Sequence, residues 1–88
     1  MPVSVYVLKS SSTGKRYIGI TGDLARRLRE HVSGNTKAGQ LLGAFFLLHV
    51  EQLQDHRTAR SRERFLKSGQ GRKWLDEMEA GPGPAGGG

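Results

Sequence analysis

The sequence predicts an α+β domain whose elements run strand, strand, helix, strand, helix and helix along the chain. Residues 3–9 and 16–21 are rich in β-branched and aromatic residues, which favours strands. Residues 24–32 and 55–68 carry apolar side chains at helical spacing. Between these predicted helices, residues 44–51 form a near-continuous apolar run of strand length. Together these observations indicate a small two-layer fold.

The composition points to one small basic domain. The 88 residues include 14 Lys and Arg against 8 Asp and Glu, a formal net charge of +6. An excess of this size suggests a polyanionic partner, first of all nucleic acid, although it also favours solubility. We place the domain at residues 1–79, because residues 80–88 (AGPGPAGGG) have too little apolar surface to fold and are expected to form a disordered tail.

Several classes of protein are disfavoured by what the sequence lacks. Without cysteine there are no disulfides, zinc ribbons or thiol nucleophiles. No apolar run approaches the ~18 residues of a membrane span, and residues 1–12 do not resemble a signal peptide. We therefore expect a cytoplasmic protein that does not associate with membranes.

The first two strands, residues 3–9 and 16–21, are predicted to pair as an antiparallel hairpin because only a short turn separates them. Side chains alternate between the two faces of a strand. Tyr6 therefore lies on the face opposite the valines of the first strand, and Tyr17 shares a face of the second strand with Gly19.

The first helix is expected to begin near Asp23, with Thr21 or Asp23 as its cap, and to end at residues 33–35. Arg27 and His31 are four residues apart, so they project together from one side of this helix. The predicted apolar stripe beside them consists of Leu24, Leu28 and Val32.

The second half of the chain begins with residues 36–43, which are expected to be an irregular loop. The apolar run at 44–51 fits a strand covered on both faces, although periodicity alone does not exclude a helix. A second helix is predicted from a cap at Asp55 or Thr58 to Ser68. Ala59, Glu63 and Leu66 share one side of it.

A short third helix is predicted at residues 72–79, after Gly69 and Gly71 have broken the second one. Trp74 and Leu75 are expected to pack back on the sheet.

The combination of polar residues suits phosphodiester cleavage. That reaction needs a proton acceptor for water, a cation for the charge on phosphorus oxygens, and a carboxylate that holds a divalent metal. The two tyrosines of the hairpin, the Arg27–His31 pair and Glu63 supply these groups. Gly19 would let a backbone or substrate approach closely.

In this order and at these spacings, the residues resemble the GIY-YIG nucleases, in particular small single-domain members. The resemblance runs from Val5 to about Leu75. Val5-Tyr6-Val7 stands where the family has its first tripeptide, and Tyr17-Ile18-Gly19 matches the second. The stretches at 21–31 (TGDLARRLREH) and 62–69 (RERFLKSG) look like the first helix and the metal helix.

The resemblance implies a three-stranded antiparallel sheet flanked by helices and one divalent metal, Mg²⁺ or Mn²⁺, held by Glu63 with waters and phosphate. It implies that Tyr17 is the general base with Tyr6 close by, and that Arg27 contacts the scissile phosphate. His31 would orient the nucleophilic water or assist its deprotonation. The first tripeptide departs from Gly-Ile-Tyr, which leaves the division of roles between the two tyrosines open.

The expected function is a metal-dependent endonuclease that hydrolyses DNA in repair or processing, at a structured or damaged site supplied by a protein partner. Further nucleic-acid contacts are expected from Gly19, Arg26, Lys67, Arg72 and Lys73. Two alternatives stay open: a non-catalytic nucleic-acid-binding domain on the same fold, and a domain that docks a partner through its apolar third strand. Taken singly, Arg27 also fits a solvated basic face, and Glu63 fits a surface pair with Lys67.

Overall fold

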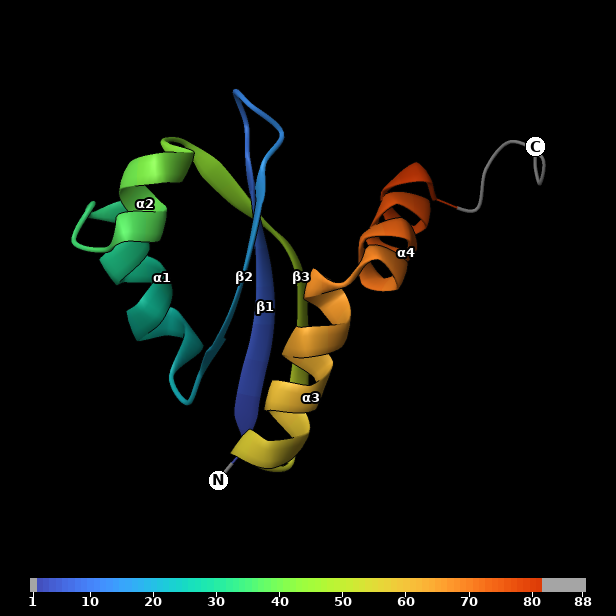
Figure 1. Cartoon of the computed structure of the whole chain (residues 1–88). Coiled ribbons are helices and arrows are strands. Elements are labelled where there is room, and N and C mark those ends of the chain that lie inside the picture. Colours follow the sequence, from blue (N-terminus) through green and yellow to red (C-terminus); the bar gives the residue numbers. More distant parts are fainter. Residues whose placement is uncertain (1, 82–88) are drawn as a thin grey trace.

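A computed structural model describes residues 2–81 as a three-stranded antiparallel sheet with helices on both faces (Figure 1). The strands are β1 (Val3–Ser10), β2 (Arg16–Thr21) and β3 (Phe45–Leu53), in the spatial order β2-β1-β3. The helices are α1 (Leu24–Val32), α2 (Lys37–Leu42), α3 (His56–Lys67) and α4 (Gly69–Ala80). The predicted fold class is confirmed, with α2 as an additional short helix. No helix among these residues has the length and apolarity needed to span a membrane.

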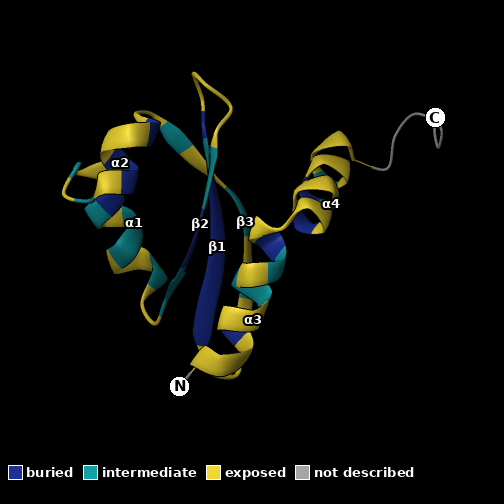
Figure 2. Ribbon diagram, in the orientation of Figure 1, coloured by how far each residue is buried: buried dark blue, intermediate teal, exposed yellow. Residues whose placement is uncertain are grey.

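The central strand β1 separates two apolar clusters. Its alternating valines pack with Ala59 and Leu66 of α3 and Leu75 of α4. Tyr6 and Leu8 point to the other face and pack with residues of α1 and α2. Figure 2 shows β1 buried along its length between these two layers. The face alternation predicted from the strand pattern is therefore confirmed, and it decides which layer each polar side chain can reach.

Helix α2 lies where the sequence predicted an irregular loop, so that prediction is wrong. Thr36 caps the helix, and its hydroxyl oxygen accepts a hydrogen bond of 2.9 Å from the Gly39 N–H. Its own residues Ala38 and Leu42 are buried. A six-residue helix that contains a glycine carries too few apolar positions to show a period, and packing on α1 decides its structure.

Two predicted burial patterns are also wrong. In α1 it is His31, 2% exposed, that packs inward, whereas Val32 of the predicted stripe is 74% exposed. In β3 the side chains of Phe46, Leu47 and Val50 are exposed rather than covered. Among the described residues β3 is an edge strand that pairs with β1, and the helices leave part of its apolar surface uncovered.

The predicted break between α3 and α4 is displaced. Ser68, not the glycines, separates the two helices, and its hydroxyl oxygen accepts from the Gly71 N–H as the cap of α4. Gly69 and Gly71 belong to the first turn of that helix, which begins at residue 69 rather than 72. Ala80 is the last residue of α4, and residues 82–88 of the predicted tail lie outside the described part of the chain.

We expect Gly71→Ala to lower the free energy of unfolding, because Gly71 is the point where α4 touches the end of α3. An added Cβ would lie less than 3.0 Å from the Phe65 carbonyl oxygen and from the Leu66 Cα, neither of which can rotate away. Overpacking of this kind costs about 1–3 kcal/mol. Gly69→Ala is the matched control, since its Cβ would meet no atom within 4 Å. Urea unfolding of both variants measures the difference, and equal stabilities would contradict this account of the junction.

Candidate active site

Three rings gather on the α1 face of the sheet. Tyr6 of β1 and Tyr17 of β2 lie with ring centroids 6.2 Å apart, and His31 enters from α1 at 5.8 Å from Tyr6 and 5.5 Å from Tyr17. The hairpin register explains the pairing, because Tyr6 lies directly opposite Gly19 in the ladder. The sequence-predicted tyrosines and histidine therefore come together in one cluster.

Gly19 makes this cluster possible. A Cβ at this position would lie 2.5 Å from the Tyr6 hydroxyl oxygen and 3.0 Å from the Tyr17 ring. The space left by the missing side chain is thus taken by the Tyr6 phenol itself. The glycine was predicted to admit a backbone or substrate, whereas within the described residues its close neighbours are these two rings.

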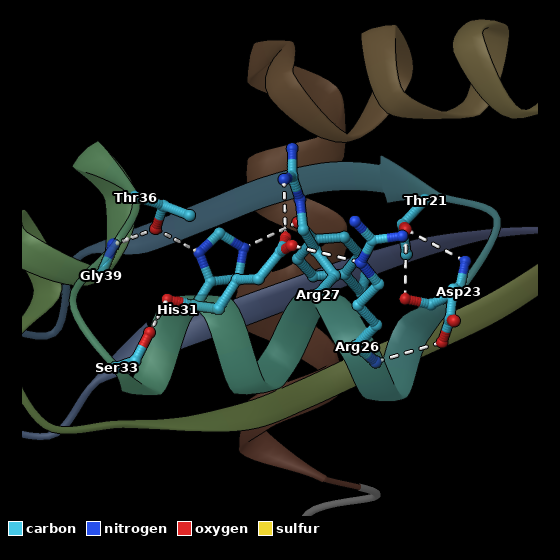
Figure 3. A network of polar contacts seen from close by, with 10 residues as sticks. Thr21, Asp23, Arg26, Arg27, His31, Ser33, Thr36 and Gly39 are labelled. Atoms are coloured by element: carbon cyan, nitrogen blue, oxygen red, sulfur yellow. Dashed lines mark hydrogen bonds and ion pairs between the residues drawn. The ribbon is translucent and has the colours of Figure 1, made fainter.

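A chain of hydrogen bonds runs through the cluster (Figure 3). The Tyr6 hydroxyl lies 2.9 Å from His31 Nε2, and His31 Nδ1 lies 2.6 Å from the Thr36 hydroxyl oxygen. Burial lowers the pKa of His31, and the nearby Arg27 cation lowers it further, while Glu30 opposes them. The imidazole is therefore neutral at pH 7 and can serve as a proton acceptor.

Burial, reinforced by the neighbouring Tyr17, raises the pKa of Tyr6 from 10 to about 12, against the opposing effect of Arg27. At neutral pH Tyr6 is a phenol that holds its proton. It can take a proton from another group only if its own proton moves on, and the His31 ring is in hydrogen-bond contact to receive it.

We expect the raised pKa of Tyr6 to appear as a loss of stability in alkali. Below pH 10 the folded and unfolded chains both keep this proton, so the stability is fully present there. Between pH 10 and about 12 only the unfolded chain releases it, so stability falls by about 2–3 kcal/mol as pH rises through this window. Tyr6→Phe should not show this loss of stability. Its absorbance titration should also lack the phenol that ionises near pH 12 in the wild type. A wild-type titration in which the Tyr6 phenol ionises near its ordinary pKa of about 10 would contradict the burial of this hydroxyl.

Arg27 lies beside the rings with much of its guanidinium available. Its Nη1 donates to Glu30 Oε1 at 3.1 Å, whereas its Nε is buried and has no hydrogen-bond partner among residues 2–81. The bound Glu30 carboxylate and the nearby Tyr6 hydroxyl raise the pKa of Arg27. The side chain borders a surface hollow of about 320 Å³ at the start of α1, lined by Thr21, Gly22, Asp23, Arg26, Arg27 and Glu30.

Glu63 is not in hydrogen-bond contact with this cluster. It lies on α3, whose buried residues pack on the opposite face of the sheet, and its carboxylate accepts from Lys67 Nζ at 3.0 Å. α3 also contacts β2, the edge strand that carries Tyr17. Within the described residues no three or more His, Cys, Asp or Glu side chains group as a metal cage. A metal on Glu63 would depend on water and substrate for its other ligands.

A second hollow, of about 420 Å³, opens between β2 and the α3–α4 pair. Its lining is basic and apolar, and consists of Gly14, Arg16, Tyr17, Ile18, Leu66, Lys67, Arg72 and Leu75. Two of the predicted nucleic-acid contacts, Lys67 and Arg72, line this hollow, while Lys73 and Arg26 are exposed elsewhere on the surface. Tyr17 borders both this hollow and the ring cluster.

Three residues at or near the site were missed by sequence reasoning. Glu30 holds Arg27, Thr36 holds His31, and Arg16 is anchored in the wall of the second hollow by Asp76 and Glu79. The spacing of Glu30 three residues after Arg27 is a signal that could have found the first pair. The other contacts join segments whose proximity no local pattern reveals.

Comparisons with known proteins show the family and a similar fold. A family model described as GIY-YIG catalytic domain matches residues 2–75. The solution NMR structure of the UPF0213 protein BH0048 from Bacillus halodurans is similar, with 29% sequence identity and a TM-score of 0.56. That similarity covers 93% of this chain and 89% of the other. No curated protein matches the sequence at a significant level.

Proposed function

Because the chain belongs to the GIY-YIG family of catalytic domains, we propose that it is a metal-dependent endonuclease that hydrolyses a phosphodiester bond of DNA. The observation that carries this proposal is the buried Tyr6–His31 hydrogen bond beside the Arg27 guanidinium. A proton acceptor and a cation side by side are two of the three groups that attack of water on a phosphodiester requires.

The tyrosines would act as a relay. Tyr17 faces the substrate and takes a proton from the attacking water, while its own proton passes to Tyr6, whose ring lies beside it with the two centroids 6.2 Å apart. Tyr6 in turn releases its proton to His31 Nε2, 2.9 Å away. The neutral imidazole is the final acceptor, which avoids forming a phenolate in a buried site.

Arg27 would bind the scissile phosphate. Its side chain is partly exposed, and the terminal guanidinium nitrogen that Glu30 does not engage could donate to a phosphate oxygen. Glu30 holds the other end of the guanidinium and keeps it oriented before substrate arrives. A guanidinium is well suited to this task because its planar set of donors matches two phosphate oxygens.

Glu63 would hold the metal. Mg²⁺ is commonly bound by one or two carboxylates together with waters and substrate phosphates, so a single glutamate fits as its protein ligand. When bound, the ion would neutralise charge on the leaving oxygen. Since α3 and the ring cluster lie on different faces of the sheet, the scissile strand would cross the edge of β2 to meet both Glu63 and the rings.

The hollow between β2 and the α3–α4 pair supports this path for the nucleic acid. Lys67 and Arg72 line it, and Tyr17 links it to the proton relay. Binding through such cations should weaken as salt increases, because released counterions drive it. A protein partner would add the specificity that so small a surface lacks, as part of a repair or processing system.

The direct test is cleavage of plasmid, flap, branched and single-stranded DNA in Mg²⁺, in Mn²⁺ and in chelator. We expect cleavage of at least one substrate with either metal and none in chelator. Salt-dependent binding without cleavage of any substrate would favour the non-catalytic nucleic-acid-binding domain. The exposed Phe46, Leu47 and Val50 favour a second candidate, a partner-docking domain, which would bind a protein but show no affinity for DNA.

A further inference from the structure

Thr36 lies between α1 and α2, outside every motif of the predicted site, and yet it contacts the innermost proton acceptor. Its hydroxyl oxygen accepts from the Gly39 N–H at 2.9 Å and lies 2.6 Å from His31 Nδ1 (Figure 3). We propose that Thr36 is a positioning residue that holds the proton of neutral His31 on Nδ1 and thereby leaves Nε2 free to accept the proton of Tyr6. This inference rests on the proposed function, because it specifies the state of the relay's last member.

The burial of the two hydroxyls decides between the tautomers. A neutral imidazole carries its proton on one nitrogen and accepts on the other. Tyr6 is fully buried, so its hydroxyl proton needs an acceptor inside the protein, and His31 Nε2 lies at 2.9 Å. Thr36 is only half-buried, so its own hydroxyl proton can be given to water while its oxygen accepts from Nδ1–H. The opposite tautomer would point Nε2–H at the Tyr6 oxygen and remove the acceptor from the relay.

The Thr36 oxygen is held in place by the short helix it caps. Its bond to the Gly39 N–H fixes the side chain at the start of α2. Gly39 in turn packs directly on the last turn of α1, where a Cβ would lie less than 3.0 Å from the His31 carbonyl oxygen. The backbone of α2 therefore touches the backbone of the residue whose ring Thr36 contacts. A histidine set between a fixed hydroxyl and a buried phenol has little freedom to change its ring orientation.

Nitrogen NMR of the histidine side chains reads the tautomer directly. In the wild-type protein at neutral pH we expect His31 Nδ1 to give a protonated signal and Nε2 an unprotonated one, with assignment by their loss in His31→Gln. Thr36→Ser keeps the oxygen and should keep this pattern. Thr36→Val removes the oxygen, and its signals should shift toward the Nε2–H tautomer. A wild-type His31 protonated on Nε2 would overturn the proposal without reference to any variant.

Cleavage rates provide the functional half of the test. Outer partners that orient a histidine commonly matter by about 10–100-fold at metal sites, and we expect a loss of that order in Thr36→Val and recovery in Thr36→Ser. Thr13→Val is the matched control, because it makes the same change of side chain at an exposed turn, where the hydroxyl oxygen accepts from the Lys15 N–H, and leaves the His31 region untouched. Equal cleavage by Thr36→Val and the wild type would overturn the positioning role.

The two proposals fail separately. A protein that cleaves no substrate contradicts the nuclease function, while the tautomer in the NMR spectrum still decides the role of Thr36. A cleaving protein with the Nε2–H tautomer contradicts the role of Thr36 and that of His31 as the last proton acceptor, while the nuclease function stands.

Discussion

Replacing Glu63 with glutamine is expected to abolish magnesium-dependent cleavage while DNA binding survives. A neutral amide is a poor ligand for a hard divalent cation, whereas a carboxylate supplies the charge that such an ion prefers. Metal stabilisation of a phosphoryl transition state amounts to several kcal/mol, so the loss should be at least about 100-fold. Glutamine keeps the size of the side chain and an oxygen that can accept from Lys67, so the fold of α3 should be preserved.

The measurement compares initial cleavage rates over a Mg²⁺ titration with DNA affinity by fluorescence anisotropy in chelator. Glu77→Gln is the matched control, because Glu77 is exposed on α4 and its replacement changes the net charge by the same amount. An unchanged rate in Glu63→Gln would remove this residue from the metal site. A loss of DNA binding equal to the loss of cleavage would assign it to binding rather than to catalysis.

Local signals in the sequence predicted most of the fold. The caps are an example: Asp23 accepts from the Arg26 N–H at 3.1 Å and Asp55 from the Thr58 N–H at 2.8 Å, as the position of an aspartate before an amphipathic run predicts. The hairpin followed in the same way from two β-rich runs around a short turn. These features depend on neighbours in sequence, so the sequence contains the physical cause of each.

The errors arise where distant contacts decide the structure. His31 is buried, and Val32 exposed, because the His31 ring bonds to Tyr6, 25 residues away in the sequence, and to Thr36, five residues away. A hydropathy pattern ranks valine above histidine as a core residue and so orients the helix wrongly. The irregular loop predicted at residues 36–43 fails for a related reason, since α2 is stabilised by packing on α1 rather than by its own composition.

The sequence predicted which residues belong to the candidate site better than it predicted where they lie. Tyr6, Tyr17, Arg27 and His31 come together because strand alternation and helical spacing fix their faces. Glu63 was predicted to join them; its carboxylate pairs with Lys67 and its helix packs against the valine face of β1, so its part in the site stays a prediction. The face of the sheet on which a helix packs depends on the path of the whole chain, and the residue spacing within α3 does not determine it.

The loss of Arg27 should cost cleavage far more than stability. Its side chain is 41% exposed and pairs with Glu30 near the surface, and such pairs contribute little to folding. In the transition state, however, its donors would meet the charge that develops on the phosphate oxygens. Removal of one preorganised donor commonly costs about 10²–10³-fold in rate, or about 2.7–4 kcal/mol. Arg27→Ala is therefore expected to retain its unfolding midpoint and lose cleavage by that factor.

Arg29→Ala is the matched control for Arg27→Ala. Arg29 is exposed on the same helix, so its replacement removes the same charge and the same amount of side chain without touching the cluster. Both variants should weaken DNA binding slightly and in a salt-dependent way, but only Arg27→Ala should slow single-turnover cleavage at saturating protein. Arg27→Lys separates charge from geometry, because lysine keeps the charge and lacks the planar pair of donors. If Arg27→Ala cleaves at the wild-type rate, Arg27 takes no part in the reaction.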